Sequence, residues 1–552
     1  MMYIPCEENT MKKTMANKEF IVLTLFVFLA AALNMTKALQ IDDTAYLEMA
    51  KAILRHPLHP LSQEINWGNT AEPIDNINQP LFIPAIYALL IKAFGESVLI
   101  LHLFIALCGA LATLLFYQLA NHFEIRQPLF LTGLFVISPS FLPGQNLMVD
   151  IPLMAFWLAF FWALLSMENE ERQKYLLAGF AVAIACLTKY TSLVLLPIFI
   201  FVILYRRHWS SLWSLGIPVT ALGLWFWFNY FDFGAIHMLG RPRVDITMHM
   251  VSYRVITWIA GMGSVSPFVL SFISLKRNDP VSRDCLLAAF ASGVALSIYM
   301  ILIGQTQFAV YWILFFIAGI FLNGFILLIL VRNIKSAWKL GERNAVEQEM
   351  ALGLWIAGTF AFIILFAPFI AVRHIFLAMP AILLILGRHV SKHGMIVSRE
   401  FMSFALTALL GLSLAVSDYY YADIYRDYAY KIRERLPQSA RVYQTGHWGW
   451  QWYSIHAGMI QYDTIKTSLE NGDYLVIPSY VDHQQISADL LPRLHEVQRL
   501  VIPAPYPTWI RTMYTDFALG GYYSFQFPKS PPWRFSRAPF EFVIFQVRIG
   551  IT

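Results

Sequence analysis

The feature that most constrains this chain is a series of apolar runs, each about as long as a bilayer is thick. A helix rises about 1.5 Å per residue, so roughly 20 apolar residues cross a hydrocarbon core of about 30 Å. The runs predict thirteen spans, at residues 20–39, 97–120, 128–147, 151–166, 176–188, 190–205, 213–230, 255–275, 285–303, 308–331, 350–370, 373–388 and 401–417. Because 58% of the residues are hydrophobic and 14% are charged, the chain is expected to be a polytopic α-helical membrane protein. Its net charge of +5 is then a topology signal and does not indicate nucleic acid.

One apolar run, at residues 81–94, is too short to span and contains Pro84 and Lys92, so we expect a helix lying at the interface. With this run left out, every predicted cytoplasmic loop is basic. The N-terminus (1–19) is then cytoplasmic, the membrane domain covers 20–417, and an odd number of spans puts 418–552 outside. The long outer loop at 40–96 opens with an amphipathic helical pattern that follows Asp42 and Asp43 and stops before Pro57.

The segment 418–552 is richer in charged residues and turn signals, and it predicts a small extracytoplasmic α/β domain. Strands are expected at 441–444, 474–477 and 541–547, and helices near 423–436 and 484–496. Beside His447, the alternating Trp448, Trp450 and Trp452 would share one face of a strand. Such a face suits a domain core or interface, which we favour, and it also suits stacking against a sugar ring.

Several ionisable residues sit where predicted spans begin, end or break, and all of them map to the outer side. They are Asp42, Asp43, Asp150, Lys189, Arg373 and His374. Each alone has a structural explanation, as a helix cap or as a long side chain reaching the interface. Together they indicate a site at the outer membrane surface, where an acid takes a proton and cations hold an anionic lipid headgroup.

These residues fall in stretches that resemble, in order, the motifs of the GT-C glycosyltransferases, which include protein O-mannosyltransferases and lipid A aminoarabinose transferases. The stretches are Asp42-Asp43-Thr44-Ala45-Tyr46-Leu47-Glu48, Asn78-Gln79-Pro80-Leu81, Asp150-Ile151-Pro152-Leu153, Leu187-Thr188-Lys189-Tyr190 and Arg373-His374-Ile375-Phe376-Leu377. The resemblance implies a GT-C-type (PMT-type) membrane domain of about thirteen helices with outer juxtamembrane helices.

The resemblance also implies an activity: inverting transfer of a sugar from a polyprenyl-phosphate donor to a hydroxyl of a lipid, glycan or protein, on the extracytoplasmic face. Asp42 would act as base, with Asp43 or Asp150 orienting it or the acceptor. Lys189 and Arg373, with His374, would hold the donor phosphate. No metal or other cofactor is expected, since bound cations stabilise the phosphate leaving group. The expected location is a bacterial inner membrane.

The remaining contacts to substrate would come from Tyr46, Glu48 and Gln79. Gln79 stands where the family has a lysine, so the grip on the donor differs here. Arg241 and Arg243 either supply the missing charge or form a solvated basic turn. A transporter or lipid-glycan flippase is the alternative function. The enzyme hypothesis requires Asp42, Asp150, Lys189 and Arg373 to face one cavity.

Overall fold

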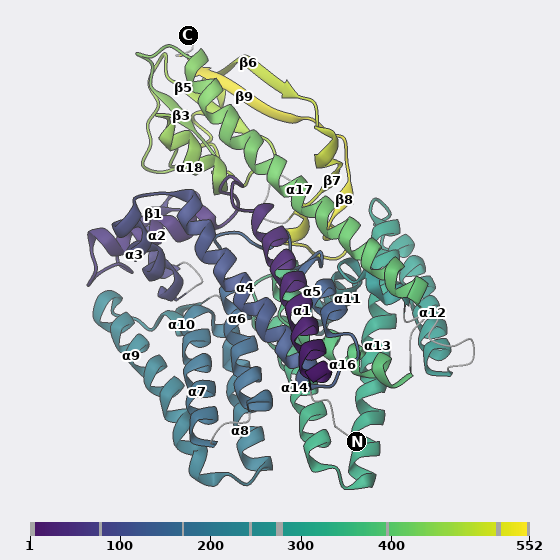
Figure 1. The fold of residues 1–552 in the computed structure, drawn as a ribbon. Helices are drawn as coiled ribbons and strands as arrows, with labels where there is room; N and C mark the ends of the chain where they lie inside the picture. Colours follow the sequence, from purple (N-terminus) through teal and green to yellow (C-terminus); the bar gives the residue numbers. More distant parts are fainter. Residues whose placement is uncertain are drawn as a thin grey trace.

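The computed structural model describes residues 6–76, 80–167, 171–241, 246–271, 280–393, 397–514 and 520–548. Figure 1 shows a helical part below and a smaller sheet-containing part above. The helices are α1 (Cys6–Ala32), α2 (Asp43–Arg55), α3 (Phe82–Phe94), α4 (Val98–His122), α5 (Pro128–Val136), α6 (Asp150–Phe161), α7 (Glu171–Thr188), α8 (Leu195–Tyr205), α9 (Gly216–Phe233), α10 (His237–Gly240), α11 (Met248–Ser264), α12 (Pro280–Leu302), α13 (Ala309–Leu340), α14 (Arg343–Leu365), α15 (Val372–Phe376), α16 (Met379–His393), α17 (Val397–Arg435) and α18 (Trp448–His456).

Six helical segments of the described chain are long and apolar enough to cross a membrane, by length and composition. They are Val98–His122, Trp209–Phe233, Ser282–Leu302, Ala309–Leu340, Arg343–Leu365 and Ser398–Arg435. The other predicted spans correspond to shorter or interrupted helices, or to α1. The number of thirteen spans and their orientation therefore stay predictions.

The predicted span at 128–147 is wrong as a continuous helix, because α5 ends at Val136. The next residues include Ser138, Pro139 and Pro143, which break a helix, and the Ser138 hydroxyl accepts the backbone N–H of Phe141. Residues 138–149 form an irregular, largely buried segment.

The two helices predicted outside the spans are present as α2 and α3. Helix α2 buries the apolar face that carries Tyr46 and Met49, and Lys51 on its other side pairs with Glu48 and Glu96. Helix α3 packs against α2 and ends at Phe94, and the next residue, Gly95, has a φ of 72° that suits a residue without a Cβ.

The C-terminal segment contains a five-stranded mixed sheet in the order β4-β3-β5-β9-β6. Its strands are β3 (Val442–Gln444), β4 (Ile460–Gln461), β5 (Tyr474–Pro478), β6 (Leu494–Ile502) and β9 (Phe540–Val547). Strand β3 is parallel to β4 and β5, whereas β9 runs antiparallel to β5 and β6. The three predicted strands are confirmed.

Two predictions for this segment are wrong. The helix expected near 484–496 is a loop, one short 3₁₀ turn at Leu491–Arg493 and the start of β6. Trp448, Trp450 and Trp452 lie on helix α18 and not on a strand. Gly446, with a φ of 116°, turns the chain out of β3 before α18 begins.

The small hairpin β1 (Glu64–Asn66) and β2 (Ala71–Pro73) belongs to the loop between α2 and α3, but it docks on the C-terminal segment. The Asp463 carboxylate accepts the Thr70 hydroxyl at 2.9 and 2.8 Å and the Ala71 N–H at 2.8 Å. Asn66 donates to the Tyr462 carbonyl at 3.0 Å.

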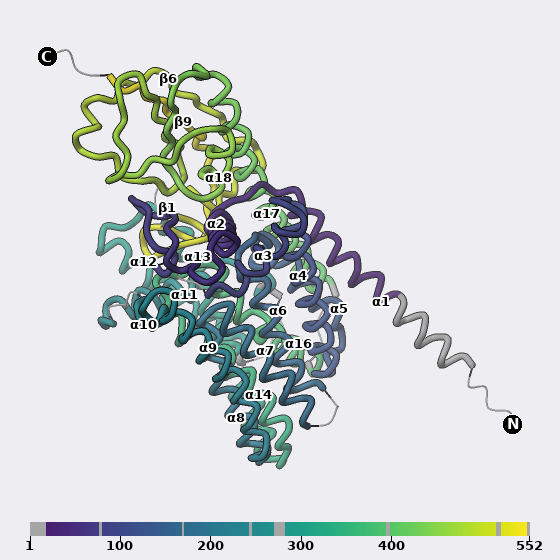
Figure 2. Tube along the Cα trace, turned by 90° about the vertical axis from the view of Figure 1, so that its left-hand side faces the viewer, coloured from purple at the N-terminus to yellow at the C-terminus, as the bar shows by residue number. Residues whose placement is uncertain are grey.

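Figure 2 shows α2, α3 and β1 between the sheet and the helical part. Helix α17 runs unbroken for 39 residues alongside both (Figure 1). The domain boundary predicted at 418 falls inside this helix, so the division stays a prediction.

Candidate active site

A cavity of about 300 Å³ lies where the start of α2, the break after α7, helix α15, the β1–β2 hairpin and the C-terminal segment meet. Its polar and aromatic lining includes Asp42, Tyr46, Trp67, Glu72, Asn76, Lys189, Arg241, Arg373, His374, Trp448, Asp482 and Tyr523. Three of the four residues that the enzyme hypothesis placed in one cavity, Asp42, Lys189 and Arg373, are among them.

The four predicted acids and bases form one cluster at this cavity. Arg373 donates from Nη1 to Asp42 Oδ2 at 2.7 Å, and Lys189 Nζ donates to Asp150 Oδ1 at 2.9 Å. The two pairs adjoin, because Arg373 Nε lies 4.0 Å from Asp150 Oδ2. Asp150 itself does not line the cavity, contrary to the prediction, and it contacts the cavity residues Lys189 and Arg373 instead.

Local backbone structure explains how these side chains converge. Asp150 is the first residue of α6, with Pro152 in the first turn, where proline needs no N–H partner. Lys189 is extended (φ −158°, ψ 131°) between the end of α7 and a 3₁₀ turn at Tyr190–Val194. Arg373 lies in the first turn of α15, after the extended Ala371. Each charge therefore sits at a helix end or break, as the sequence predicted.

Two buried nitrogen atoms at the cavity have no hydrogen-bond partner among the described residues. They are Arg373 Nε, which lies 4.0 Å from Asp150 Oδ2, and His374 Nδ1, which is near the Phe369 backbone without an ideal hydrogen-bond geometry. Buried polar atoms in folded proteins are nearly always paired. The cavity therefore offers hydrogen-bonding capacity next to two cations, which suits an anionic group.

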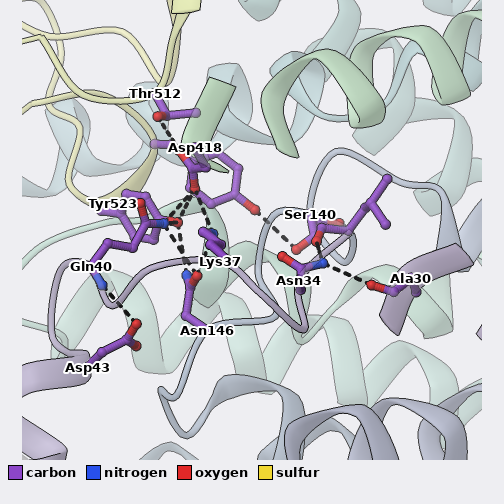
Figure 3. A network of polar contacts seen from close by, with 12 residues as sticks. Ala30, Asn34, Lys37, Gln40, Asp43, Ser140, Asn146, Asp418, Thr512 and Tyr523 are labelled. Atoms are coloured by element: carbon purple, nitrogen blue, oxygen red, sulfur yellow. Dashed lines mark hydrogen bonds and ion pairs between the residues drawn. The ribbon is translucent and has the colours of Figure 1, made fainter. Parts of the chain in front are cut away.

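Asp43 faces away from the cavity, into a second set of buried polar groups that we call the sealed network. Its Oδ2 accepts the Gln40 N–H at 3.0 Å, and burial raises the pKa of Asp43 to about 7 despite that hydrogen bond. Figure 3 shows how Gln40 continues into the network. The network is made of Lys37, Gln40, Asn146, Asp418, Thr512 and Tyr523. Of these six residues, Tyr523 alone also lines the cavity.

Only some of the other residues predicted to contact substrate line the cavity. Tyr46 and Arg241 line the cavity, and the Arg241 guanidinium lies 5.6 Å from the centre of the Tyr190 ring. Glu48 does not line it, because its carboxylate turns toward Lys51 at 3.6 Å. Gln79 and Arg243 lie outside the described residues.

Sequence reasoning missed one whole side of the cavity, the domain-side wall, which consists of Trp67, Glu72, Asn76, Trp448 and Asp482. The sequence pattern assigns Trp448 to a strand. It has a φ of 64°, a left-handed conformation that is rare for a bulky residue, and its carbonyl accepts the Thr44 hydroxyl at 2.7 Å. Trp67 and Glu72 carry no motif, and only the docking of the hairpin brings them here.

Comparison with known proteins gives one sequence match and several similar structures. Residues 78–228 match the family of dolichyl-phosphate-mannose-protein mannosyltransferases. No curated protein sequence matches the chain.

Two of the similar solved structures are bacterial and archaeal. ArnT from Cupriavidus metallidurans, bound to undecaprenyl phosphate, has a TM-score of 0.40 and 14% identity, over 88% of this chain and 96% of that one. The archaeal oligosaccharyltransferase AglB from Archaeoglobus fulgidus, in complex with an inhibitory peptide and a dolichol-phosphate, has a TM-score of 0.39 and 14% identity, over 83% of this chain and 69% of that one. The family match at residues 78–228 includes three of the stretches that resemble GT-C motifs, Asn78–Leu81, Asp150–Leu153 and Leu187–Tyr190, so this part of the chain is similar to those glycosyltransferases in two independent ways.

Proposed function

We propose that this protein transfers a sugar from a polyprenyl-phosphate donor to a hydroxyl acceptor, a lipid, glycan or protein, at the extracytoplasmic membrane surface. The observation that carries the proposal is the convergence of Asp42, Lys189 and Arg373 on one cavity. The matched family uses dolichyl phosphate mannose, which is a polyprenyl-phosphate sugar, and this supports the donor class.

In the proposed reaction the acceptor oxygen attacks the anomeric carbon while the bond from that carbon to the phosphate oxygen breaks. The acceptor proton goes to Asp42, and the bonding electrons leave with the phosphate. Arg373 and Lys189 stabilise the charge that grows on the phosphate. A single displacement of this kind inverts the anomeric centre, and no step requires a metal ion.

The ion pair between Arg373 and Asp42 suggests how the donor prepares the base. A phosphate entering the cavity competes with Asp42 for the Arg373 guanidinium, which favours bidentate contacts to phosphate. Once Arg373 turns to the phosphate, the Asp42 carboxylate is free to accept a proton. The base is then active only when the donor is bound.

The test is a transfer assay with the purified full chain in lipid nanodiscs, a panel of labelled polyprenyl-phosphate sugars, and lipid, glycan and protein acceptors. We expect Asp42→Asn to lower transfer at least about 100-fold, since general base catalysis contributes about 10²–10⁴-fold. Asp489→Asn, an exposed position away from the cavity, should leave the rate unchanged. Retained turnover in Asp42→Asn would overturn the base assignment. Movement of a lipid-linked sugar across the bilayer without transfer would favour the flippase alternative.

A further inference from the structure

The domain-side wall has a different chemistry from the rest of the cavity. Its residues are two acids, Glu72 and Asp482, one amide, Asn76, and the tryptophans at 67 and 448. The cations Lys189, Arg241 and Arg373 belong to other elements of the lining. One cavity thus combines a region suited to phosphate with a region of carboxylates and aromatic rings.

The domain-side wall is held as one unit by the C-terminal segment. Gln484 donates to Asn66 Oδ1 at 3.1 Å, and Gln451 donates to the Asn66 carbonyl at 3.1 Å. On the other side of Trp67, the Ala71 N–H donates to the Asp463 carboxylate at 2.8 Å. Because the hairpin and the C-terminal segment are joined on both sides of Trp67, its ring has a fixed support.

Trp67 is half-buried at the cavity, with its ring centre 5.5 Å from that of His447. Burial lowers the pKa of His447 to about 4, so its ring is uncharged at neutral pH. Nearby, the Glu72 carboxylate accepts the Asn76 amide at 3.0 Å. An aromatic face beside carboxylate acceptors matches a sugar ring, which has one apolar C–H face and hydroxyl groups that donate from its edge.

We propose that the domain-side wall binds an uncharged pyranose ring, with Trp67 as the stacking surface and Glu72 and Asp482 as acceptors for its hydroxyl groups. The reaction in which this sugar takes part rests on the proposed function. The binding of the sugar is argued from the wall residues and does not depend on that function. Two carboxylates on the same wall repel an anionic ring, so uronic acids and phosphorylated sugars are disfavoured. The ring belongs either to the donor or to the acceptor, which share this chemistry.

The first experiment measures binding without turnover, by saturation-transfer NMR on the full chain in nanodiscs at pH 7.5. The probes are methyl α-D-mannopyranoside and methyl β-D-glucopyranoside as neutral rings, and methyl β-D-glucuronide as the anionic ring. We expect saturation of the ring protons of a neutral probe, a loss of at least about fivefold in Trp67→Ala, and substantial retention in Trp67→Phe, which keeps an aromatic face. The control Trp509→Ala removes a half-buried tryptophan of the C-terminal segment that does not line the cavity.

A comparison of the anionic and the neutral probes tests whether the two carboxylates disfavour a charged ring. The glucuronide should give a weaker signal than the glucoside, and the double variant Glu72→Gln with Asp482→Asn should narrow that difference. Equal signals in wild type and Trp67→Ala, or a glucuronide that binds as well as the neutral rings, would overturn the proposal. The thermal midpoint of each variant shows whether a lost signal reflects lost folding, and Trp67→Phe keeps the test valid if Trp67→Ala unfolds.

A second arm assigns the ring to its source once a productive donor and acceptor are known. A higher KM for the acceptor alone in Trp67→Ala assigns the ring to the acceptor, and a higher KM for the donor alone assigns it to the donor. Unchanged KM values for both would contradict the subsite. Probe binding in a protein that transfers nothing would count against the proposed function and leave the subsite standing.

Discussion

The cavity cluster and the sealed network are built from the same chemistry and differ in their access to ligand. In the cavity, Arg373 and Lys189 face carboxylates, and the Asp42 side chain is 27% exposed. In the network, Lys37 lies 3.6 Å from Asp418, and their side chains are 1% and 0% exposed. Both link segments that are far apart in the sequence.

The difference lies in which hydrogen bonds are already made. In the network, Lys37 Nζ donates to Asn146 Oδ1 at 2.6 Å, and the Asn146 amide donates to the Tyr523 hydroxyl (Figure 3). Gln40 donates to Asp418 and Tyr523 at 2.9 and 2.8 Å. Gln40 Oε1 in the network has no hydrogen-bond partner among the described residues, but the network's cation, Lys37, is enclosed by Asn146 and Asp418. At the cavity it is the cation itself, Arg373, that keeps a nitrogen, Nε, without a hydrogen bond in the described part of the chain. A cation enclosed by its partners stabilises a fold, whereas a cation with an unused donor beside a cavity can bind a ligand.

The largest expected effect comes from breaking the sealed network. Lys37→Met leaves Asp418 buried without its cation, which costs about 3–5 kcal/mol of the free energy of unfolding for pairs of this kind. SDS-induced unfolding in micelles measures the loss. The double variant Lys37→Met with Asp418→Asn should recover part of it, because no lone charge remains.

The matched control is Lys466→Met, which removes a lysine that is 55% exposed and pairs with Glu64 at 2.7 Å. An exposed pair contributes about 0–1 kcal/mol. If Lys37→Met destabilises the protein no more than Lys466→Met does, the network has no structural role.

The second-largest effect is expected at Arg373, where a substitution should lower the transfer rate much more than the free energy of unfolding. Arg373→Gln removes the cation nearest Asp42, and we expect transfer to fall about 100-fold, or about 2.7 kcal/mol in the activation barrier. Lys189 still pairs with Asp150 in this variant, so the loss of stability should be smaller than in Lys37→Met. Arg373→Lys should restore part of the rate, since it returns the charge without the fork of donors.

Initial rates at saturating donor measure this effect, and Arg537→Gln, an exposed position away from the cavity, is the control. A rate within threefold of wild type in Arg373→Gln would exclude Arg373 from the reaction and would erase the distinction between the two clusters.

The sequence predicted the cavity cluster better than the sealed network because the two carry different signals. Asp42, Lys189 and Arg373 lie in stretches that resemble family motifs, at ends or breaks of apolar runs. Lys37 fell inside the predicted span 20–39, although α1 ends at Ala32, and nothing local connects it to Asp418. A pairing across such a separation depends on how the helices pack.

The domain-side wall was unpredictable for a related reason. Trp67 lies in the turn of a two-stranded hairpin whose place is set by the Asp463 carboxylate, and the sequence gives no sign of that contact. The alternation of Trp448, Trp450 and Trp452 has the period of a strand, but the segment is helical. The α18 backbone packs so closely on the loop before α2 that a Cβ at Gly449 would lie 1.8 Å from the Leu39 carbonyl oxygen. Tertiary contact decided the structure there over local pattern.

The smallest effect concerns Asp43, which sits between the two clusters, and it should appear as a pH dependence of stability. Burial raises its pKa in the fold to about 7, with Asp42 adding to the shift and Lys37 opposing it. Between pH of about 4 and 7 the folded state keeps a proton that the unfolded state releases, so the contribution of Asp43 to stability falls as the pH rises through that range.

The variant Asp43→Asn resembles the protonated form. Its free energy of unfolding should depend less on pH, and it should match that of wild type most closely at the acidic end. Unfolding titrations at pH 4.5, 6 and 8, with the exposed Asp489→Asn as control, measure the difference. If the difference in the free energy of unfolding between wild type and Asp43→Asn is the same at all three pH values, the Asp43 carboxyl does not titrate in this pH range. Asp43 would then belong with the groups whose charge the fold has already compensated.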